Sequence, residues 1–145
     1  MDRRRAPRTT ELITNSPEET LAYAAKIRKN AKAGAVFSLM GELGSGKTTF
    51  VKGLVSCHER EVSSPTFTYL HIYPGEIPIY HFDLYRLKDV TEFLAMGFDE
   101  YLHGDGICCV EWAERIESIL PKHTLFFHFS HSGEERRKIV RHEWD

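Results

Sequence analysis

The stretch that most constrains the fold is residues 41–48, which read GELGSGKT. They fit the phosphate-binding loop pattern, in which four variable positions separate a glycine from Gly-Lys-Ser/Thr. Glycines allow positive φ angles, so successive backbone N–H groups can turn toward phosphate oxygens. A helix that begins at the end of the loop directs its positive end at the same anion. Lys47 can then reach the β and γ phosphates, while the Thr48 hydroxyl is placed to bind Mg²⁺.

The residues around this loop predict the strand and the helix that the motif requires. Residues 35–40 form a short apolar run of strand length. Apolar residues after the loop recur at helical spacing, at Phe50, Val51, Leu54 and Val55. The alternative is a glycine-rich turn between two ordinary elements. We prefer the phosphate-binding loop because a lysine and a threonine both fall where its chemistry requires them.

Length and composition indicate a soluble globular chain. At 145 residues, with 41% hydrophobic and 28% charged residues, it is long enough to bury its own core. A net charge of −2 argues neither for nor against nucleic acid. No apolar run approaches the roughly 20 residues that span a bilayer, so we expect no membrane contact. Residues 1–10 read as a flexible basic tail, with a weak RNA-contacting arm as the alternative, and residues 11–145 as a single domain.

The cysteines and histidines suggest no disulfide framework and no structural metal. The three cysteines are few and odd in number, and Cys108 and Cys109 are adjacent within an apolar run. We therefore interpret this pair as small buried side chains in a reducing compartment, and expect a cytoplasmic protein. The 8 histidines are scattered, without the spacing of a zinc site.

Apolar patterns and turn residues predict a compact α/β fold with a mixed, partly antiparallel sheet in three layers. The expected elements are a helix from Ser16 to Gly34, the loop strand and helix, a hairpin at 67–82, a helix ending at Met96, a turn at 99–102, a strand at 106–111, a helix at 113–120, and two strands at 125–129 and 138–140. The strand at 106–111 is apolar throughout, which favours a central place in the sheet.

Two acidic residues end apolar strands and could serve a bound nucleotide. Asp83 follows residues 79–82, and Glu111 follows residues 107–110. In proteins with this loop, a strand-end carboxylate usually supplies a further contact to Mg²⁺. One acid could bind the metal while the other orients the attacking water, and the sequence does not divide these roles. The alternative for each is a helix cap or a turn carboxylate.

Thr66 and Trp112 are two further candidates. Thr66 lies in a Ser-Pro-Thr-Phe stretch after the loop helix, where its hydroxyl could meet Mg²⁺ or the γ phosphate as switch loops do. The alternative is a proline-marked loop that simply enters a strand. Trp112 could pack near the nucleotide, although a tryptophan is more often part of the core.

Missing signatures favour ATP and disfavour a stand-alone kinase. Neither Asn15 nor Asn30, the only asparagines, sits in the NKxD signature that gives GTPases their guanine specificity. A small-molecule kinase needs an acceptor pocket and an arginine-bearing lid, for which the chain leaves little room. A kinase, or a binding module that never turns the nucleotide over, remains the alternative.

Five segments together resemble the bacterial TsaE (YjeE) family. In chain order they are GELGSGKTT, SSPTFTYL, IYHFDLYRL, GFDEYL and CVEWAERI. The resemblance covers the chain from about Glu11 to its end. It implies a P-loop ATPase that acts in making threonylcarbamoyladenosine next to the anticodon of tRNAs that read codons beginning with adenine. It also implies that the chain works with a TsaD–TsaB heterodimer, in which TsaD carries the transfer chemistry, and that it contacts tRNA only indirectly or weakly.

The resemblance also implies roles for individual residues. Thr48 and Glu111 would hold Mg²⁺, and Asp83 would orient the attacking water near the γ phosphate. Thr66 would sit in the switch-like loop, and Trp112 close to the nucleotide. The residues implied to cradle the phosphates are Gly44, Ser45, Gly46, Lys47, Thr48 and Thr49. Two stretches, residues 15–20 and 133–137, would border the base.

Departures from the family pattern are small. Ser45 occupies a position that is often alanine, and Ala113 follows the tryptophan where proline is common. The link at residues 57–61 looks irregular for the family. None of these departures removes a phosphate-binding or metal-binding group.

Overall fold

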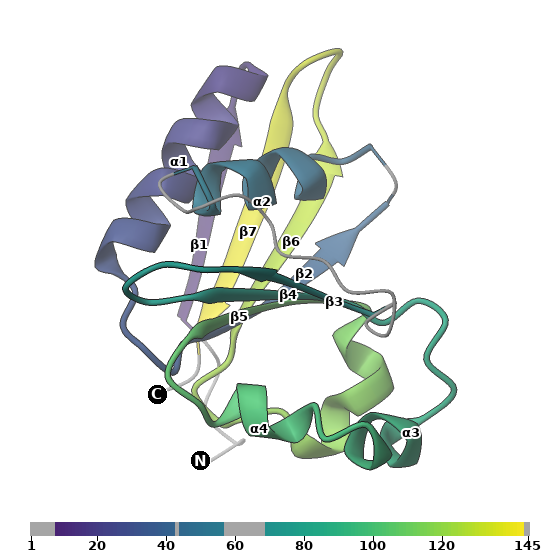
Figure 1. Cartoon of the computed structure of the whole chain (residues 1–145). Coiled ribbons are helices and arrows are strands. Elements are labelled where there is room, and N and C mark those ends of the chain that lie inside the picture. Colours follow the sequence, from purple (N-terminus) through teal and green to yellow (C-terminus); the bar gives the residue numbers. More distant parts are fainter. Residues whose placement is uncertain (1–7, 43, 57–68, 144–145) are drawn as a thin grey trace.

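A computed structural model describes residues 8–42, 44–56 and 69–143, and these form one seven-stranded sheet in the order β1-β7-β6-β2-β5-β4-β3 (Figure 1). The strands are β1 (Arg8–Thr14), β2 (Val36–Gly41), β3 (Leu70–Tyr73), β4 (Ile79–Asp83), β5 (Ile107–Glu111), β6 (Leu125–His131) and β7 (Arg137–Glu143). Strands β6, β2, β5 and β4 run parallel, while β1, β7 and β3 pair antiparallel with their neighbours. The predicted mixed α/β sheet is therefore confirmed.

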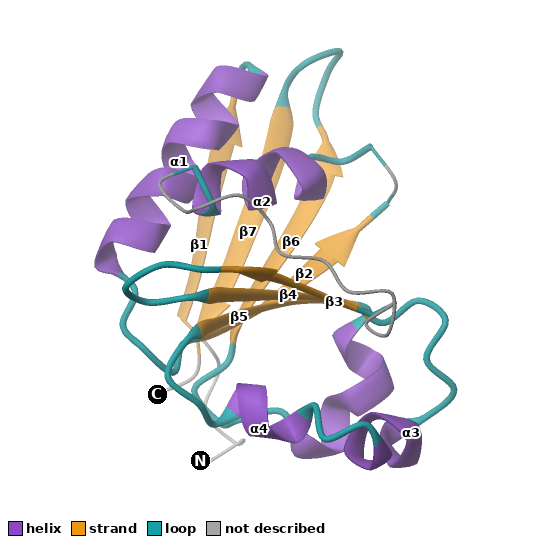
Figure 2. Cartoon of the chain, viewed as in Figure 1, coloured by secondary structure: helices purple, strands orange, loops and turns teal. Residues whose placement is uncertain are grey.

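Helices cover both faces of this sheet (Figure 2). They are α1 (Pro17–Asn30), α2 (Lys47–Leu54), α3 (Val90–Ala95), α4 (Asp99–Leu102) and the 3₁₀ helix η1 (Ala113–Ile119). One core cluster joins α1 and α2 to the sheet through Ala24 and Phe50, and a second joins α3 and η1 to the other face through Phe93 and Ile116. The three predicted layers are confirmed. Within the described ranges, no helix is both long and apolar enough to cross a membrane.

Local hydrogen bonds fix the start of α1. Ser16 Oγ accepts from the backbone N–H of Glu19 at 3.2 Å, and Glu19 Oε1 accepts from the N–H of Asn15 at 2.8 Å. Such side-chain acceptors satisfy N–H groups near a helix start, as the sequence predicts. The helix ends at Asn30, however, and not at Gly34, because the next residue adopts an extended backbone. Gly34, with φ 93°, instead lies in the turn that leads to β2.

The basic tail predicted for residues 1–10 is too long by three residues. Arg8–Thr14 forms β1, in which Arg8 is opposite Glu143 of β7. Arg8 Nη2 also lies 3.3 Å from Glu143 Oε1. This strand was not predicted from the sequence. It pairs with backbone groups of β7 that would otherwise form an open sheet edge.

The segment predicted as a helix at residues 113–120 is a 3₁₀ helix with a kink at Ile116. Its buried residues, Ala113 and Ile116, are three positions apart. In a 3₁₀ helix, with three residues per turn, this spacing places both side chains on one face, and that face packs against the sheet.

The adjacent cysteines of β5 are both buried, as predicted. Cys108 is 1% exposed and Cys109 is 0% exposed, and they belong to the clusters on opposite faces of the sheet. Burial raises the pKa of Cys108 to about 12 and that of Cys109 well above its usual range. Both thiols therefore remain neutral at ordinary pH and act as small packing groups. Cys57 lies outside the described residues.

Candidate functional site

The loop between β2 and α2 turns on glycines with positive φ angles. Gly41 has φ 142°, and Gly46, which precedes α2, has φ 113°. A Cβ on Gly41 would collide with the carbonyl oxygen of Phe129, and one on Gly46 would lie 3.4 Å from Arg137 Cγ. Only glycine therefore fits at residue 41, where the loop passes against β6. The predicted order of strand, glycine loop and helix is confirmed.

Ser45 is a buried residue of this loop. The residue is fully buried, and its Oγ has no hydrogen-bond partner among the described residues. Its backbone N–H donates to Glu42 O at 3.1 Å. A Cβ placed on Gly41 would lie 2.7 Å from this Oγ, so the hydroxyl faces the backbone of Gly41, and Ser45 is not among the residues that line the cavity described below.

Strand alternation brings the two predicted acids to the face that carries α2. Ile79 of β4 and Cys109 of β5 belong to the core cluster shared with α2. Since side chains alternate along a strand, His81, Asp83 and Glu111 project from that same face. Asp83 and Glu111 are Cα partners at the ends of adjacent parallel strands.

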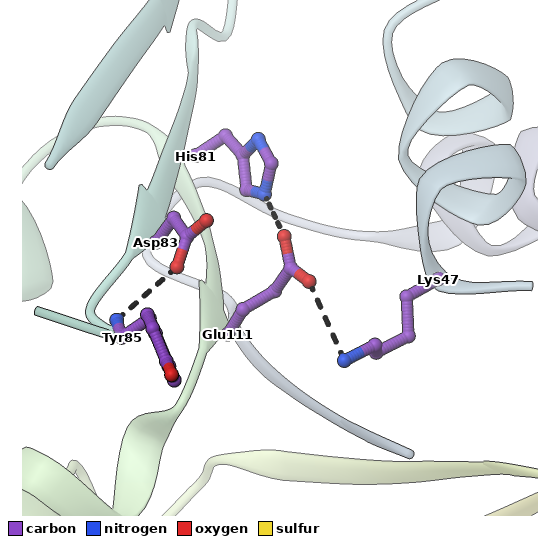
Figure 3. Close-up of polar contacts among 5 residues, drawn as sticks. All are labelled: Lys47, His81, Asp83, Tyr85 and Glu111. Carbon is purple, nitrogen blue, oxygen red and sulfur yellow. Dashed lines mark hydrogen bonds and ion pairs between the residues drawn. The ribbon is translucent and has the colours of Figure 1, made fainter. Parts of the chain in front are cut away.

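The carboxylate of Glu111 lies between two donors (Figure 3). Lys47 Nζ is 3.7 Å from Glu111 Oε1, and His81 Nε2 is 2.8 Å from Oε2. Burial alone would raise the pKa of Glu111, but the hydrogen bond from His81 and the charges of His81 and Lys47 outweigh it and hold the pKa below its ordinary value. Glu111 is therefore ionised at neutral pH.

Asp83 is exposed and has a different partner. Its Oδ1 accepts from the backbone N–H of Tyr85 at 3.2 Å (Figure 3). The backbone N–H of Asp83 donates to Tyr69 O at 2.9 Å, which links the strand end to the residue before β3. This carboxylate is thus oriented by the turn that follows it and keeps access to solvent.

Trp112 is at the surface and not in the core. It has φ 61°, the one positive φ angle among the described residues other than glycine, and it is 39% exposed. Its ring centroid lies 5.1 Å from that of Tyr85, and Arg115 Cζ lies 5.6 Å from it on the ring face. A left-handed non-glycine backbone costs roughly 1–3 kcal/mol and persists only where neighbours enforce it.

A cavity of about 950 Å³ lies at the carboxyl ends of β2, β4 and β5. Its lining includes the predicted Gly44, Gly46, Lys47, Thr48, Thr49, Asp83, Glu111 and Trp112. Pro17, Thr20, Glu135 and Arg137 also line it, and they come from the two stretches expected to border a base. Thr66 lies outside the described residues, so its predicted role stays a prediction.

Three residues of the site were not predicted from the sequence. They are His81, which contacts Glu111, and Tyr85 and His128, which line the cavity. His81 and Tyr85 stand two positions before and after Asp83, so strand alternation offered a signal for His81. No local pattern indicated His128, because β6 joins the site only through its pairing with β2.

A parallel strand, a glycine loop and a helix, with a strand-end carboxylate facing the loop lysine, define the P-loop NTPase fold class. The sequence model of the family described as "Threonylcarbamoyl adenosine biosynthesis protein TsaE" matches residues 14–139. The chain therefore belongs to the TsaE family.

Known proteins resemble the chain over most of its length. It is 46% identical to the tRNA threonylcarbamoyladenosine biosynthesis protein TsaE of Bacillus subtilis, over 88% of this chain and 81% of that protein. Identity to the protein of the same name from Treponema pallidum is 36%, over 88% and 96%. The crystal structure of Bacillus subtilis YdiB superimposes with a TM-score of 0.79 at 37% identity, over 96% of this chain and 88% of that one.

Proposed function

We propose that this chain binds and hydrolyses Mg²⁺–ATP as a step in the biosynthesis of threonylcarbamoyladenosine in tRNAs that read codons beginning with adenine. The observation that carries the proposal is that Lys47, Asp83 and Glu111 converge on one cavity beside the glycine loop. The names of its relatives, tRNA threonylcarbamoyladenosine biosynthesis protein TsaE, support the pathway.

The loop would bind the phosphates of ATP. Positive φ angles at Gly44 and Gly46 support a backbone whose N–H groups turn toward an anion, and α2 begins directly after Gly46. Ser45 would contribute through its backbone, because its buried side chain does not line the cavity. Lys47 would supply the mobile cation. The full phosphate-binding set is Gly44, Ser45, Gly46, Lys47, Thr48 and Thr49.

Thr48 and Glu111 would hold Mg²⁺. The metal prefers hard oxygen ligands and commonly uses one or two protein oxygens beside substrate phosphates and water. A hydroxyl and an ionised carboxylate that line the same cavity fit that requirement. The chemistry that Mg²⁺ supplies when bound is neutralisation of the charge on the β and γ phosphates.

Asp83 would orient the attacking water. Its carboxylate lines the cavity, is open to solvent, and is oriented by the backbone N–H of Tyr85. Phosphoryl transfer depends on the positioning of the nucleophile more than on covalent chemistry. Thr66 would add a hydroxyl from the switch-like loop, and Trp112 with Tyr85 would form the wall of the cavity near the nucleotide.

ATP hydrolysis would reset a TsaD–TsaB complex in the cytoplasm, with the transfer to tRNA carried out by TsaD. The chain would then control when the partner's reaction cycle restarts. It would contact tRNA only through the complex. ATP is favoured over GTP because the sequence has no NKxD signature.

Phosphate release by the purified chain tests the proposed activity. We expect slow release that requires Mg²⁺ and that rises when TsaD and TsaB are added together. ATP consumption that rises only with a small-molecule acceptor, with the phosphate transferred to that acceptor instead of released, would favour a kinase. Tight binding of ATP without release in any mixture would favour a binding module without turnover.

Nucleoside mass spectrometry of tRNA tests the proposed pathway. Depletion of this protein from its host should lower threonylcarbamoyladenosine, and restoring the parent gene should return it, whereas a Lys47→Ala gene should not. Unchanged levels after depletion would overturn the assignment to this pathway.

A further inference from the structure

The two carboxylate oxygens of Glu111 contact different side chains. Oε1 lies 3.7 Å from Lys47 Nζ, on the side of the loop, and Oε2 lies 2.8 Å from His81 Nε2, on the neighbouring strand (Figure 3). Lys47 reaches Glu111 with a long, flexible side chain from the first residue of α2, whereas His81 has a short side chain on a strand within the sheet. The two contacts therefore differ in how firmly their donors are held.

The contact to His81 has a defined direction. A carboxylate that serves as a metal ligand is ionised, so its oxygens can only accept hydrogen bonds. Nε2 of His81 must therefore carry the hydrogen and donate it to Oε2. At 2.8 Å this is a short hydrogen bond to a charged acceptor, which is the stronger kind.

The sheet holds His81 in place. The residue is in the middle of β4, opposite His71 of β3 and Cys109 of β5, and its side chain is only 15% exposed. The rings of His71 and His81 have centroids 6.1 Å apart. The donor thus starts from a backbone that is paired on both sides.

We propose that His81 is a positioning residue, which fixes the orientation of the Glu111 carboxylate so that Oε1 is presented to Mg²⁺; this inference rests on the proposed function. The terminal χ angle of a glutamate has a broad energy minimum, so strand geometry alone does not set the direction of its oxygens. A hydrogen bond to Oε2 supplies the missing constraint. Partners of this kind, one step removed from the metal, typically account for a 10- to 100-fold difference in metal affinity, an order-of-magnitude range.

Two substitutions at His81 separate the effect of its N–H donor from the effect of its ring. His81→Phe keeps a planar ring beside His71 but has no N–H, whereas His81→Gln keeps an N–H donor of similar reach. The measurement is calorimetric binding of a non-hydrolysable ATP analogue, over a series of Mg²⁺ concentrations and in EDTA. We expect His81→Phe to raise the Mg²⁺ concentration for half-maximal binding about tenfold or more. Its affinity in EDTA should stay within about twofold of the parent, and His81→Gln should restore the Mg²⁺ requirement to within about threefold.

Tyr80→Phe is the matched control. Tyr80 is the preceding residue of β4, on the opposite face, and its hydroxyl donates to Asp105 Oδ1 at 3.1 Å. Loss of that bond perturbs the same strand without touching Glu111, so the Mg²⁺ requirement should not change. The inference is overturned if His81→Phe matches the parent, or if the phenylalanine and glutamine variants are equally impaired. A parent that shows no Mg²⁺-dependent binding overturns the proposed function as well.

Discussion

Asp83 and Glu111 are Cα partners at the ends of parallel strands, yet their carboxylates have different surroundings. Glu111 is mostly buried between Lys47 and His81, whereas Asp83 is exposed and accepts from the backbone N–H of Tyr85. A carboxylate held by two donors suits a metal ligand, and an exposed one suits the orientation of water. The strand-end acids therefore support a division of roles that the sequence leaves open.

Alanine at each acid should separate binding of the metal from turnover. We expect Glu111→Ala to raise the Mg²⁺ requirement for phosphate release more than Asp83→Ala does, because the first variant loses a proposed metal ligand. Asp83→Ala should lower kcat about 100-fold while ATP binding is spared, since a positioned side chain that assists proton transfer contributes roughly that much. Phosphate-release kinetics and calorimetry measure the two effects, and the reverse pattern would mean that the two roles are exchanged.

Lys47→Ala should weaken ATP binding about 10- to 100-fold, because a hydrogen bond to a charged group contributes roughly 1.5–3 kcal/mol. The matched control is Lys52→Ala, which removes the same charge from the exposed last turn of α2. Calorimetry with ATP and Mg²⁺ should show no loss for the control. Equal affinity of parent and Lys47→Ala would exclude the loop as the nucleotide site.

Local chemistry explains the parts of the fold and site that the sequence predicted. The loop glycines at 41–48, the capping residue Ser16 and the hairpin turn after Tyr73 each act within a few residues of the chain. The positions of Asp83 and Glu111 at strand ends also follow from local apolar runs. These local patterns can be read from the sequence without knowing the strand order.

Long-range pairing explains what the sequence did not predict. β1 forms because residues 8–14 pair with the edge of β7, more than 120 residues further along the chain. The role of His81 depends on β4 lying beside β5, and that of His128 on β6 lying beside β2. Each pairing joins segments whose adjacency leaves no local pattern.

The stability of the chain should fall below the ordinary pKa of Glu111. That pKa is lowered from 4.5 in the folded protein, so the unfolded chain binds a proton more readily and Glu111 stabilises the fold above about pH 4.5. The contribution is lost as pH falls through the lower, folded pKa. Urea unfolding between about pH 3 and 7, in EDTA, should show a shallower acid slope for Glu111→Gln than for the parent. An unchanged slope would contradict the lowered pKa.

Gly41→Ala should destabilise the fold far more than Gly34→Ala. Both glycines have positive φ, at 142° and 93°, so each alanine is strained by its backbone. At Gly41 the new Cβ also collides with the carbonyl oxygen of Phe129, whereas at Gly34 nothing lies within 4 Å. A collision with backbone cannot be relieved by turning a side chain, so we expect Gly41→Ala to cost at least about 2 kcal/mol more in the free energy of unfolding. Urea unfolding of the two variants measures the difference. If both variants lose the same free energy of unfolding, backbone strain alone requires glycine at residue 41, and the close contact of the loop with β6 does not.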